Sequence, residues 1–285
     1  MKKTPLVVVV GATASGKSEM VLELAEKFNG EIICADSRTI YKGMDIGTAK
    51  PSSEDRLKIK HHLLDIVAPD EEFNAAEFKR LANRTIEEIK GRGKIPFLAG
   101  GTGLYISGVV YDYGFGDKKD PLIRTRLEKE TTEDLKKKAK KLALTEDDIN
   151  FKNRRHLIRA IERGGIIKGD DKLRDNCLIL GIDIGQDELK SRIRKRIDRM
   201  IKSGLEKEVR KLVSMYSFNA AGMDAICYKE WQSYFAGEQS LAELKEEMYK
   251  NTWQYARRQK TWFRRDKNIR WATSSDEASV LVYQF

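Results

Sequence analysis

The sequence predicts an α/β fold in which a parallel sheet is flanked by helices and interrupted by a helical insertion. Short apolar runs alternate with helical patterns through the first third of the chain, an order that favours right-handed crossovers and parallel strands. A glycine-rich loop joins the first strand pattern to the first helix. From about residue 115 charged helical patterns replace the strands, and strand character returns at Cys177.

The first third of the chain reads strand, helix, strand, helix, strand. We expect strands at Leu6–Val10, Glu31–Ala35 and Ile95–Ala99, and helices at Glu19–Phe28 and Ala75–Gly91. An asparagine occupies the N-cap position of the second helix, and the glycine at its end suits a C-cap. Because ligands bind at the carboxyl ends of parallel strands, the loops after these three strands should converge on one site.

The change of texture near residue 115 divides the chain. We expect an α/β core from residues 1–114 and 177–285, and a helical insertion from residues 115–176. Inside the insertion we expect charged helices from Pro121 to Asp148, a basic helix from Asn153 to Arg163 and a polar segment from Gly164 to Asn176. After it we expect a strand at Cys177–Asp183, helices at Asp187–Ser203 and Leu241–Arg265, and a last strand at Ile269–Ala272.

Composition limits the class of protein. The 285 residues are 40% hydrophobic and 34% charged, which is ordinary for a soluble globular protein. The apolar run near the N-terminus is too short to cross a bilayer, so we expect a cytoplasmic protein. We also expect a monomer. The three cysteines form no C-x-x-C pair and no zinc site is expected. The net charge of +10 favours a polyanionic partner such as nucleic acid, although a lysine-rich surface would give the same charge.

The loop after the first strand carries the strongest motif. It reads G-x-x-x-x-G-K-S between a strand and a helix, the signature of a P-loop. Its glycines let successive N–H groups point at phosphate oxygens, beside the positive end of the helix. Lys17 would neutralise phosphate charge and the Ser18 hydroxyl could bind Mg²⁺. The motif predicts a P-loop NTPase-like, nucleotide- or ATP-binding type of site, formed by Gly11, Ala12, Thr13, Ala14, Ser15, Gly16, Lys17 and Ser18.

Three weaker motifs follow. Asp36 and Ser37 end the second strand, where the aspartate could bind a metal, act in catalysis or simply cap a turn. The segment Gly43–Pro51 reads as an ordered loop over the site. Small residues after the third strand allow close backbone approach, and Thr102 offers a hydroxyl to a substrate, although a tight turn alone would explain them.

Two stretches are densely basic. Arg155 and Arg159 lie one helical turn apart, and Trp253–Arg265 interleaves aromatic rings with cations. Such mixtures suit RNA, because guanidinium groups hold phosphates while flat rings stack on unpaired bases. The alternative is a solvated helix face with its aromatic residues in the core. We expect Trp262 and Phe263 to be core residues and most of the arginines to be functional.

Taken together these segments resemble the bacterial tRNA dimethylallyltransferase family, of the isopentenyltransferase type. The matching pieces are GATASGKS, ADSRTIYKGMDIGTAKP, HLLD from His62, IPFLAGGTGLY, NRRHLIRAIE and YARRQKTWFR, in the family's order. The second piece is the most specific, because nucleotide kinases do not carry it. The family fold is a P-loop α/β domain with a helical insertion, which agrees with the pattern read from the residues.

The resemblance implies an activity and a role for each matching residue. The enzyme would move a dimethylallyl group from dimethylallyl pyrophosphate to the exocyclic amine of the adenosine immediately 3′ of the anticodon in tRNA, giving isopentenyladenosine. Lys17 and its loop would hold the pyrophosphate, Mg²⁺ would bind near Ser18, Asp36 would be the general base and Thr102 would place the amine. The residues implied to contact tRNA are Asp36, Ser37, Arg38, Thr39, Thr102, Arg124, Arg155, His156, Arg159, Trp253, Gln254, Arg257 and Arg258.

The chain departs from the family pattern at a few positions. Thr39, His156 and Trp253 replace a common Gln, Arg and Arg. Asp224 stands where Arg or Gln is usual, and Cys227 stands where Gly is usual. A carboxylate near a pyrophosphate would be repelled, so we expect Asp224 to face solvent or to pair with a cation such as Lys229 or an arginine of the 257–265 helix.

Other functions fit parts of the pattern. A small-molecule P-loop kinase explains Lys17 and Ser18 equally well, but it does not explain the long second motif or the basic insertion. An adenylate prenyltransferase acting on free nucleotides would share the site without needing a tRNA-gripping insertion. A pure RNA-binding module would have no use for the phosphate loop.

Overall fold

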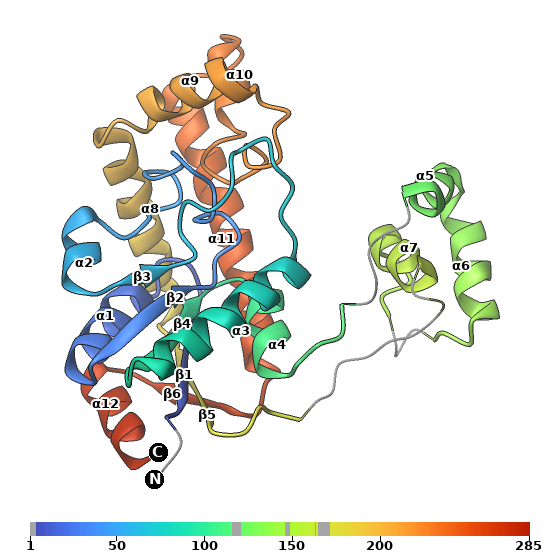
Figure 1. Cartoon of the computed structure of the whole chain (residues 1–285). Coiled ribbons are helices and arrows are strands. Elements are labelled where there is room, and N and C mark those ends of the chain that lie inside the picture. The colour runs from blue at the N-terminus through green and yellow to red at the C-terminus, as the bar shows by residue number, and fades with distance from the viewer. Residues whose placement is uncertain (1–3, 116–120, 146–148, 163, 165–171) are drawn as a thin grey trace. The chain divides into compact units, whose positions relative to one another are not determined.

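The computed structural model describes residues 4–115, 121–145, 149–162, 164 and 172–285. The chain divides into two compact units, one formed by Met1–Val110 with Leu173–Phe285 and the other by Tyr111–Lys172. Most of the polar segment expected at 164–176, the last residue of the expected 153–163 helix and residues 146–148 lie outside the described residues. The larger unit contains the sheet, and the elements of the smaller unit are helices (Figure 1).

The sheet of the larger unit has six strands in the order β3-β2-β4-β1-β5-β6, and every pairing is parallel. The strands are β1 (Leu6–Gly11), β2 (Gly30–Cys34), β3 (His61–His62), β4 (Ile95–Gly100), β5 (Cys177–Ile182) and β6 (Ile269–Ala272). All five expected strands form. β5, which follows the insertion, pairs along the whole of β1, so the chain returns to the centre of the sheet. Both strands are buried throughout, which explains their continuous apolar sequence.

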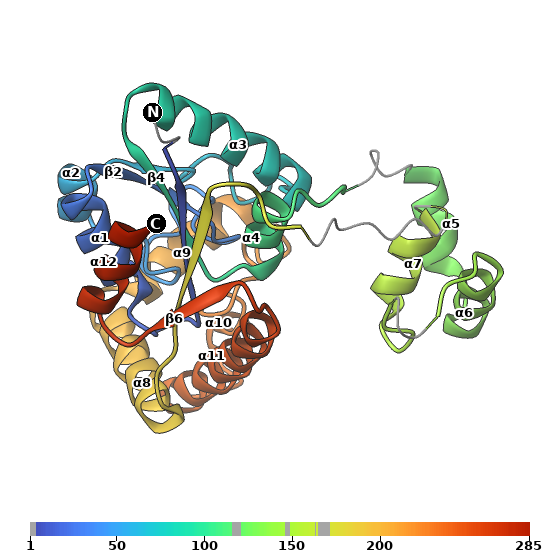
Figure 2. The ribbon, with the colours of Figure 1, turned by 90° about the horizontal axis from the view of Figure 1, so that it is seen from below.

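Nine helices are described in the larger unit. They are α1 (Lys17–Lys27), α2 (Ser53–Lys58), α3 (Ala75–Gly91), α4 (Gly103–Val110), α8 (Gln186–Lys202), α9 (Leu205–Tyr216), α10 (Trp231–Phe235), α11 (Leu241–Arg264) and α12 (Ser275–Gln284). α1 and α12 lie beside each other on the sheet (Figure 2), and they share one apolar core with it, to which Val9, Leu24 and Val282 belong. The α/β fold with a parallel sheet and flanking helices is therefore as the sequence predicts.

A second apolar core joins the helices that follow β5. Side chains of α8, α9 and α11, among them Ile193, Val209 and Met248, pack with Ile40 and Met44 from the segment after β2. The helices of the larger unit that are not part of the sequence expectation are α2, α4, α9, α10 and α12. The second core attaches α8, α9 and α11 to the segment after β2, at the carboxyl edge of the sheet.

The C-cap of α3 differs from the expectation. Gly91 is the last helical residue and Arg92 is the C-cap, with an ordinary negative φ. Gly93 has a φ of +71°, the left-handed conformation that favours glycine. The glycine that ends the helix is therefore Gly93, and the assignment of the cap to Gly91 was wrong. At the other end Asn74 accepts the N–H groups of Ala76 and Glu77, as an N-cap should.

The smaller unit has its own core. Its helices are α5 (Pro121–Lys129), α6 (Thr132–Lys141) and α7 (Arg154–Glu162). Leu127, Leu135 and Leu157 come from these three helices and pack together with Phe151. The insertion therefore buries an apolar cluster of its own, which fits a module attached to the sheet domain.

A buried glutamate ties three parts of the larger unit together, away from the phosphate loop. Glu31 lies in β2, and its side chain is 3% exposed. Its carboxylate accepts hydrogen bonds from His62 Nε2 and Arg92 Nη2, both at 2.7 Å, and lies 3.3 Å from Lys94 Nζ. Burial alone would raise the pKa of Glu31, but the bonds from Arg92, His62 and Lys94 outweigh it and lower the pKa to about 2.

We expect Glu31→Gln to destabilise the larger unit by roughly 1.5–3 kcal/mol, the range for hydrogen bonds to a charged group. The pKa of Glu31 is lower in the folded chain, so its contribution is present above pH 4.5 and is lost as pH falls toward 2. Thermal unfolding from pH 7 to pH 3 should therefore show a smaller acid-dependent loss in the variant than in the wild type. Glu54→Gln, at a side chain 80% exposed, is the control. Equal losses in wild type and Glu31→Gln would contradict this role.

Candidate active site

The phosphate loop connects the buried strand β1 to α1. Gly16 is the N-cap of α1 with a φ of +99°, and Ala14 also has a positive φ of +64°. A Cβ at Gly11 would lie 2.7 Å from Ser15 Oγ, so the loop closes tightly on itself. This curled backbone lies at the positive end of the helix, where phosphate groups bind in loops of this type.

Two polar groups inside the loop suit an anion. Lys17 Nζ donates to the carbonyl oxygen of Ala12 at 3.3 Å. Burial lowers the pKa of Lys17 to about 8, an effect that nearby Asp36 opposes and Arg196 increases. The buried hydroxyl of Ser15 has no hydrogen-bond partner in the described part of the chain. Phosphate oxygens would satisfy both groups. The hydroxyl-bearing Ser18 lies at the exposed start of α1.

The loops after β2 and β4 meet at the same edge of the sheet. The Ser37 N–H donates to Thr102 Oγ1 at 3.0 Å, and the Thr102 N–H donates to the carbonyl of Ala35 at 3.3 Å. A Cβ at Gly100 would lie 2.0 Å from the Ala35 carbonyl oxygen, so only glycine permits this approach. The predicted convergence of the strand-end loops is confirmed.

Asp36 is half-buried at the centre of this meeting point. Its Oδ1 accepts the N–H of Arg38 at 2.9 Å, so the turn-capping role is present. Burial lowers the pKa of Lys17 on the phosphate loop and of Arg196 on α8, and the negative charge of Asp36 opposes that effect in both. Burial raises the pKa of Tyr255 on α11, and Asp36 adds to the rise. Capping uses one carboxylate oxygen, so the other stays available for chemistry.

Sequence reasoning missed Gln259, which is 5% exposed on α11. Its Oε1 accepts the N–H of Thr13 and its Nε2 donates to the carbonyl of Gly101, both at 2.8 Å. The same helix brings Tyr255 to Thr102 and Gln259, where burial raises its pKa to about 12. The signal that could have revealed Gln259 is a polar residue in register with the buried face of the helix, between Ala256 and Phe263.

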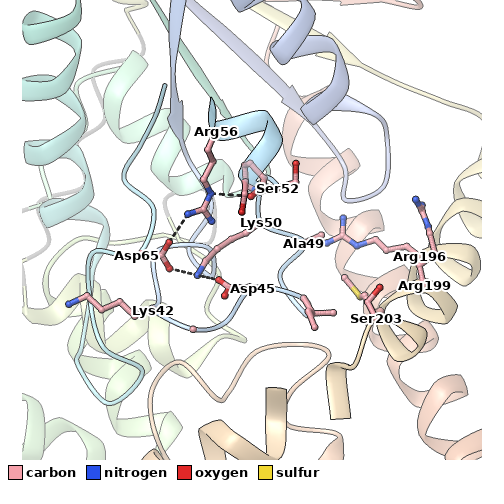
Figure 3. A pocket seen from close by; sticks show the side chains of 15 residues that line it. Lys42, Asp45, Ala49, Lys50, Ser52, Arg56, Asp65, Arg196, Arg199 and Ser203 are labelled. Carbon is pink, nitrogen blue, oxygen red and sulfur yellow. Dashed lines mark hydrogen bonds and ion pairs between the residues drawn. The ribbon is translucent and has the colours of Figure 1, made fainter. Parts of the chain in front are cut away.

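A pocket of about 950 Å³ lies between the Gly43–Pro51 loop and α8 (Figure 3). Lys50 lies between the two acids of its lining, Asp45 and Asp65, at 2.7 and 2.5 Å. Arg196 donates to the carbonyl of Thr48 at 3.2 Å, and burial lowers its pKa while Cys227 and Asp36 oppose that effect. Five cations line the pocket against the two acids, and this positive excess favours an anionic occupant. They are Lys42, Lys50, Arg56, Arg196 and Arg199.

The Gly43–Pro51 loop forms one wall of this pocket, and a side chain of α9 holds the loop in place. Glu208 accepts the N–H groups of Asp45, Ile46 and Gly47 at 3.1, 2.8 and 3.2 Å. Tyr228 donates its hydroxyl to the same carboxylate at 2.6 Å. Neither Glu208 nor Arg196 is part of the sequence prediction, because their partners in this loop lie more than a hundred residues away along the chain.

One face of α11 is polar and exposed. Gln254, Arg257, Arg258, Thr261, Trp262 and Arg265 line a hollow of about 480 Å³. Phe263 is buried as expected, but Trp262 is 45% exposed, so its assignment to the core was wrong. Trp262 falls one turn after Arg258, on the exposed side of the helix, and its ring lies against Gly103. Trp253 is partly buried beside the second core, with Lys190 Nζ 5.5 Å from its ring centre.

The four basic residues of the smaller unit that were expected to contact tRNA fall into two groups. Arg124 and Arg159 both pair with the buried carboxylate of Glu162, at 3.2 and 3.6 Å, and Arg159 also donates to the carbonyl of Phe115. Arg155 and His156 are exposed, and within the described residues neither side chain is paired. The first group therefore stabilises the unit, and the second is available to a ligand.

Three of the departures from the family pattern have structural explanations. Thr39 is buried, and its hydroxyl donates to the Asp36 carbonyl at 3.4 Å, so it shapes the turn after β2. The Arg38 guanidinium of the same turn donates to the Ala221 carbonyl at 3.3 Å. The side chain of Asp224 is 74% exposed and lies 3.4 Å from Lys229 Nζ, as expected. Cys227 is buried with a φ of +74°, which explains why glycine suits this position.

Across the described residues no helix is long and apolar enough to cross a membrane. The same residues contain no group of three His, Cys, Asp or Glu side chains placed to hold a metal ion.

Comparison with known proteins agrees with this geometry. A family model described as IPP transferase matches residues 39–266. The tRNA dimethylallyltransferase of Acetivibrio thermocellus is 43% identical, with 95% of this chain and 92% of the relative covered. That of Geobacter sulfurreducens is 40% identical, with 99% and 97% covered.

Solved structures give the same assignment. The full-length tRNA isopentenylpyrophosphate transferase of Bacillus halodurans has a TM-score of 0.76 and 36% identity, with 100% of this chain and 95% of that one covered. A eukaryotic dimethylallyltransferase acting on tRNA has a TM-score of 0.80 and 26% identity, with 98% and 76% covered. The resemblance inferred from the sequence motifs is thus confirmed, and the chain belongs to the IPP transferase family of tRNA dimethylallyltransferases.

Proposed function

We propose that this protein is a tRNA prenyltransferase that moves a dimethylallyl group from dimethylallyl pyrophosphate to the exocyclic amine of the adenosine immediately 3′ of the anticodon. The observation that carries the proposal is the meeting of a phosphate loop, a carboxylate and a threonine hydroxyl beneath a helix with an exposed basic face. Relatives named tRNA dimethylallyltransferase over nearly the whole chain support it.

The phosphate loop accounts for the leaving group. As the bond between the prenyl carbon and oxygen breaks, the pyrophosphate gains negative charge. Loop N–H groups, Lys17 and the half-buried Arg196 would stabilise that charge where it develops. The hydroxyl of Ser18 would hold Mg²⁺ together with substrate oxygens, a donor set that suits this hard cation. When bound, the cation would add positive charge at the same oxygens.

Asp36 accounts for the activation of the nucleophile, which is the adenine amine. The adenine amine is weakly nucleophilic because its lone pair is delocalised into the ring. As the amine nitrogen forms its bond to the prenyl carbon, it becomes acidic, and a carboxylate within hydrogen-bond reach takes the proton. Asp36 would be that base, with Thr102 holding the amine in place. Atoms and charge balance, since the nitrogen–carbon bond forms, the carbon–oxygen bond breaks and pyrophosphate departs.

The exposed face of α11 accounts for the RNA. Gln254, Arg257 and Arg258 would contact the anticodon loop, and Arg155 and His156 of the smaller unit would contact phosphates. The target base has to leave its stack to reach the site, and an unpaired loop makes that step inexpensive. One chain supplies the proposed contacts, so we propose that the protein acts as a monomer.

Two other functions remain to be separated by experiment. A small-molecule kinase would use the same Lys17 and Ser18, and an adenylate prenyltransferase would use the same site on a free nucleotide. The protein should be incubated with labelled dimethylallyl pyrophosphate and tRNA, AMP or ATP. We expect the label in tRNA alone, on the adenosine after the anticodon. Label in AMP or ATP, or phosphate transfer from ATP to a small acceptor without prenyl transfer, would replace the proposal with one of the alternatives.

Asp36→Asn tests the base. The amide keeps the shape and the hydrogen bond to Arg38, but it cannot take a proton, so we expect turnover to fall by roughly 10²–10⁴-fold with little change in tRNA affinity. Asp224→Asn is a matched control at an exposed aspartate and should retain full turnover. Rates should be measured at saturating substrates. Near-wild-type turnover in Asp36→Asn would exclude Asp36 as the base.

Arg155→Ala tests the RNA contact of the smaller unit. Removal of one phosphate contact should reduce the slope of log affinity against log salt by about 0.7–1. Arg155 is a clearer test of RNA contact than Arg159, because the removal of Arg159 would also break its bonds to Glu162 and Phe115. Binding of tRNA should be titrated at several salt concentrations, with Arg84→Ala on α3 as the exposed-arginine control. The same slope in wild type and Arg155→Ala would mean that Arg155 only solvates its helix.

A further inference from the structure

Gln259 is the point at which α11 holds two loops of the site at once. Its side chain is buried, with one end on the Thr13 N–H of the phosphate loop and the other on the Gly101 carbonyl of the loop after β4. A neutral primary amide carries both an acceptor and a donor, and the Gln259 side chain is long enough to reach both groups. The pairing leaves both loop backbone groups satisfied and fixes the position of one loop against the other.

The held loop contains the threonine of the site. Gly101 precedes Thr102, whose Oγ1 accepts the Ser37 N–H. On the other side of Thr102 the ring of Trp262 lies against Gly103, where a Cβ would come within 2.4 Å of Trp262 Nε1. Gln259 and Trp262 are three residues apart on α11 and flank Thr102. The helix therefore holds the Thr102 loop through Gln259, Trp262 and Tyr255, and it holds the phosphate loop through Gln259.

We propose that Gln259 is a positioning residue that sets the distance between the pyrophosphate and the attacking amine. The inference rests on the proposed function, because the phosphate loop would carry one reactant and Thr102 the other. Reacting atoms must come within about 3–3.5 Å in line, and a shift of roughly 1 Å can cost 10²-fold in rate. Removal of the amide would leave the two loops without a shared hydrogen-bond partner. Every group that contacts the reacting atoms would still be present.

Gln259→Met keeps the length of the side chain and removes both hydrogen bonds. We expect kcat for tRNA prenylation to fall about 10–100-fold, and KM for tRNA to change less than about threefold because Arg257 and Arg258 are untouched. Thr252→Val is the matched control: Thr252 is buried two turns earlier on the same face and has no hydrogen bond to either loop in the described residues. It should retain wild-type kcat. Folding is checked by thermal unfolding of each variant.

A double-mutant cycle separates positioning from general damage. If Gln259 acts by placing Thr102, Gln259→Met should cost less than about threefold in kcat when Thr102 is already alanine. Gly101→Ala gives an independent route, because its Cβ would lie 2.2 Å from Gln259 Nε2 and displace that amide without altering Gln259. It should lower kcat like Gln259→Met, and the two changes together should cost no more than either alone.

The outcomes are distinct. Full kcat in Gln259→Met or in Gly101→Ala, or costs that multiply with Thr102→Ala, would overturn the positioning role. If Gln259→Met does not fold, the cycle between Gly101→Ala and Thr102→Ala decides by the same criterion. Failure of the wild type to prenylate tRNA would instead overturn the proposed function.

Discussion

The site depends on the close approach of backbone segments at the carboxyl edge of the sheet. The Gln259 amide then holds these segments in position. Gly100 lies so near the Ala35 carbonyl that any side chain would collide, and this contact brings Thr102 to Ser37. The phosphate loop lies on the neighbouring strand, and Gln259 bonds both loops from α11. The chemistry assigned to Lys17, Asp36 and Thr102 requires that these three loops keep one arrangement.

Charge is organised around the same point. Asp36 lies near Lys17 and Arg196, two cations whose pKa values burial lowers. Burial of like charges is costly unless an anion joins them. A pyrophosphate would supply that anion, while Asp36 remains close enough to receive a proton. The acid at the end of β5, Asp183, pairs instead with Lys260 and Arg264, and those bonds outweigh burial and lower its pKa. Asp36 and Asp183 thus lie at the same edge of the sheet but have different neighbours. Asp183 is held in ion pairs, whereas Asp36 would be free to receive a proton.

Much of this architecture could be predicted from sequence, because local patterns determine it. Apolar strand runs and the glycine loop placed β1, β2, β4 and β5, and motifs placed Lys17, Asp36 and Thr102 at one edge. Gln259, Arg196 and Glu208 were missed because each acts on a segment distant in sequence. The helical pattern can indicate that Gln259 is buried, but it cannot indicate which loops its amide bonds. Trp262 was misassigned because its aromatic character suggested burial, whereas the rotation of α11 exposes it. The pairing of Arg124 and Arg159 with Glu162 is likewise a tertiary contact.

The proposed reaction requires one arrangement of loops that brings a prenyl pyrophosphate and a flipped adenine together at Asp36. The most direct measurement is a structure of the protein bound to an anticodon stem-loop and an unreactive thio analogue of dimethylallyl pyrophosphate. We expect the pyrophosphate in the Gly11–Ser18 loop, and the adenine amine within hydrogen-bond reach of Asp36 and about 3–3.5 Å from the prenyl carbon. An adenine bound away from Asp36, or a pyrophosphate outside that loop, would contradict the proposed reaction.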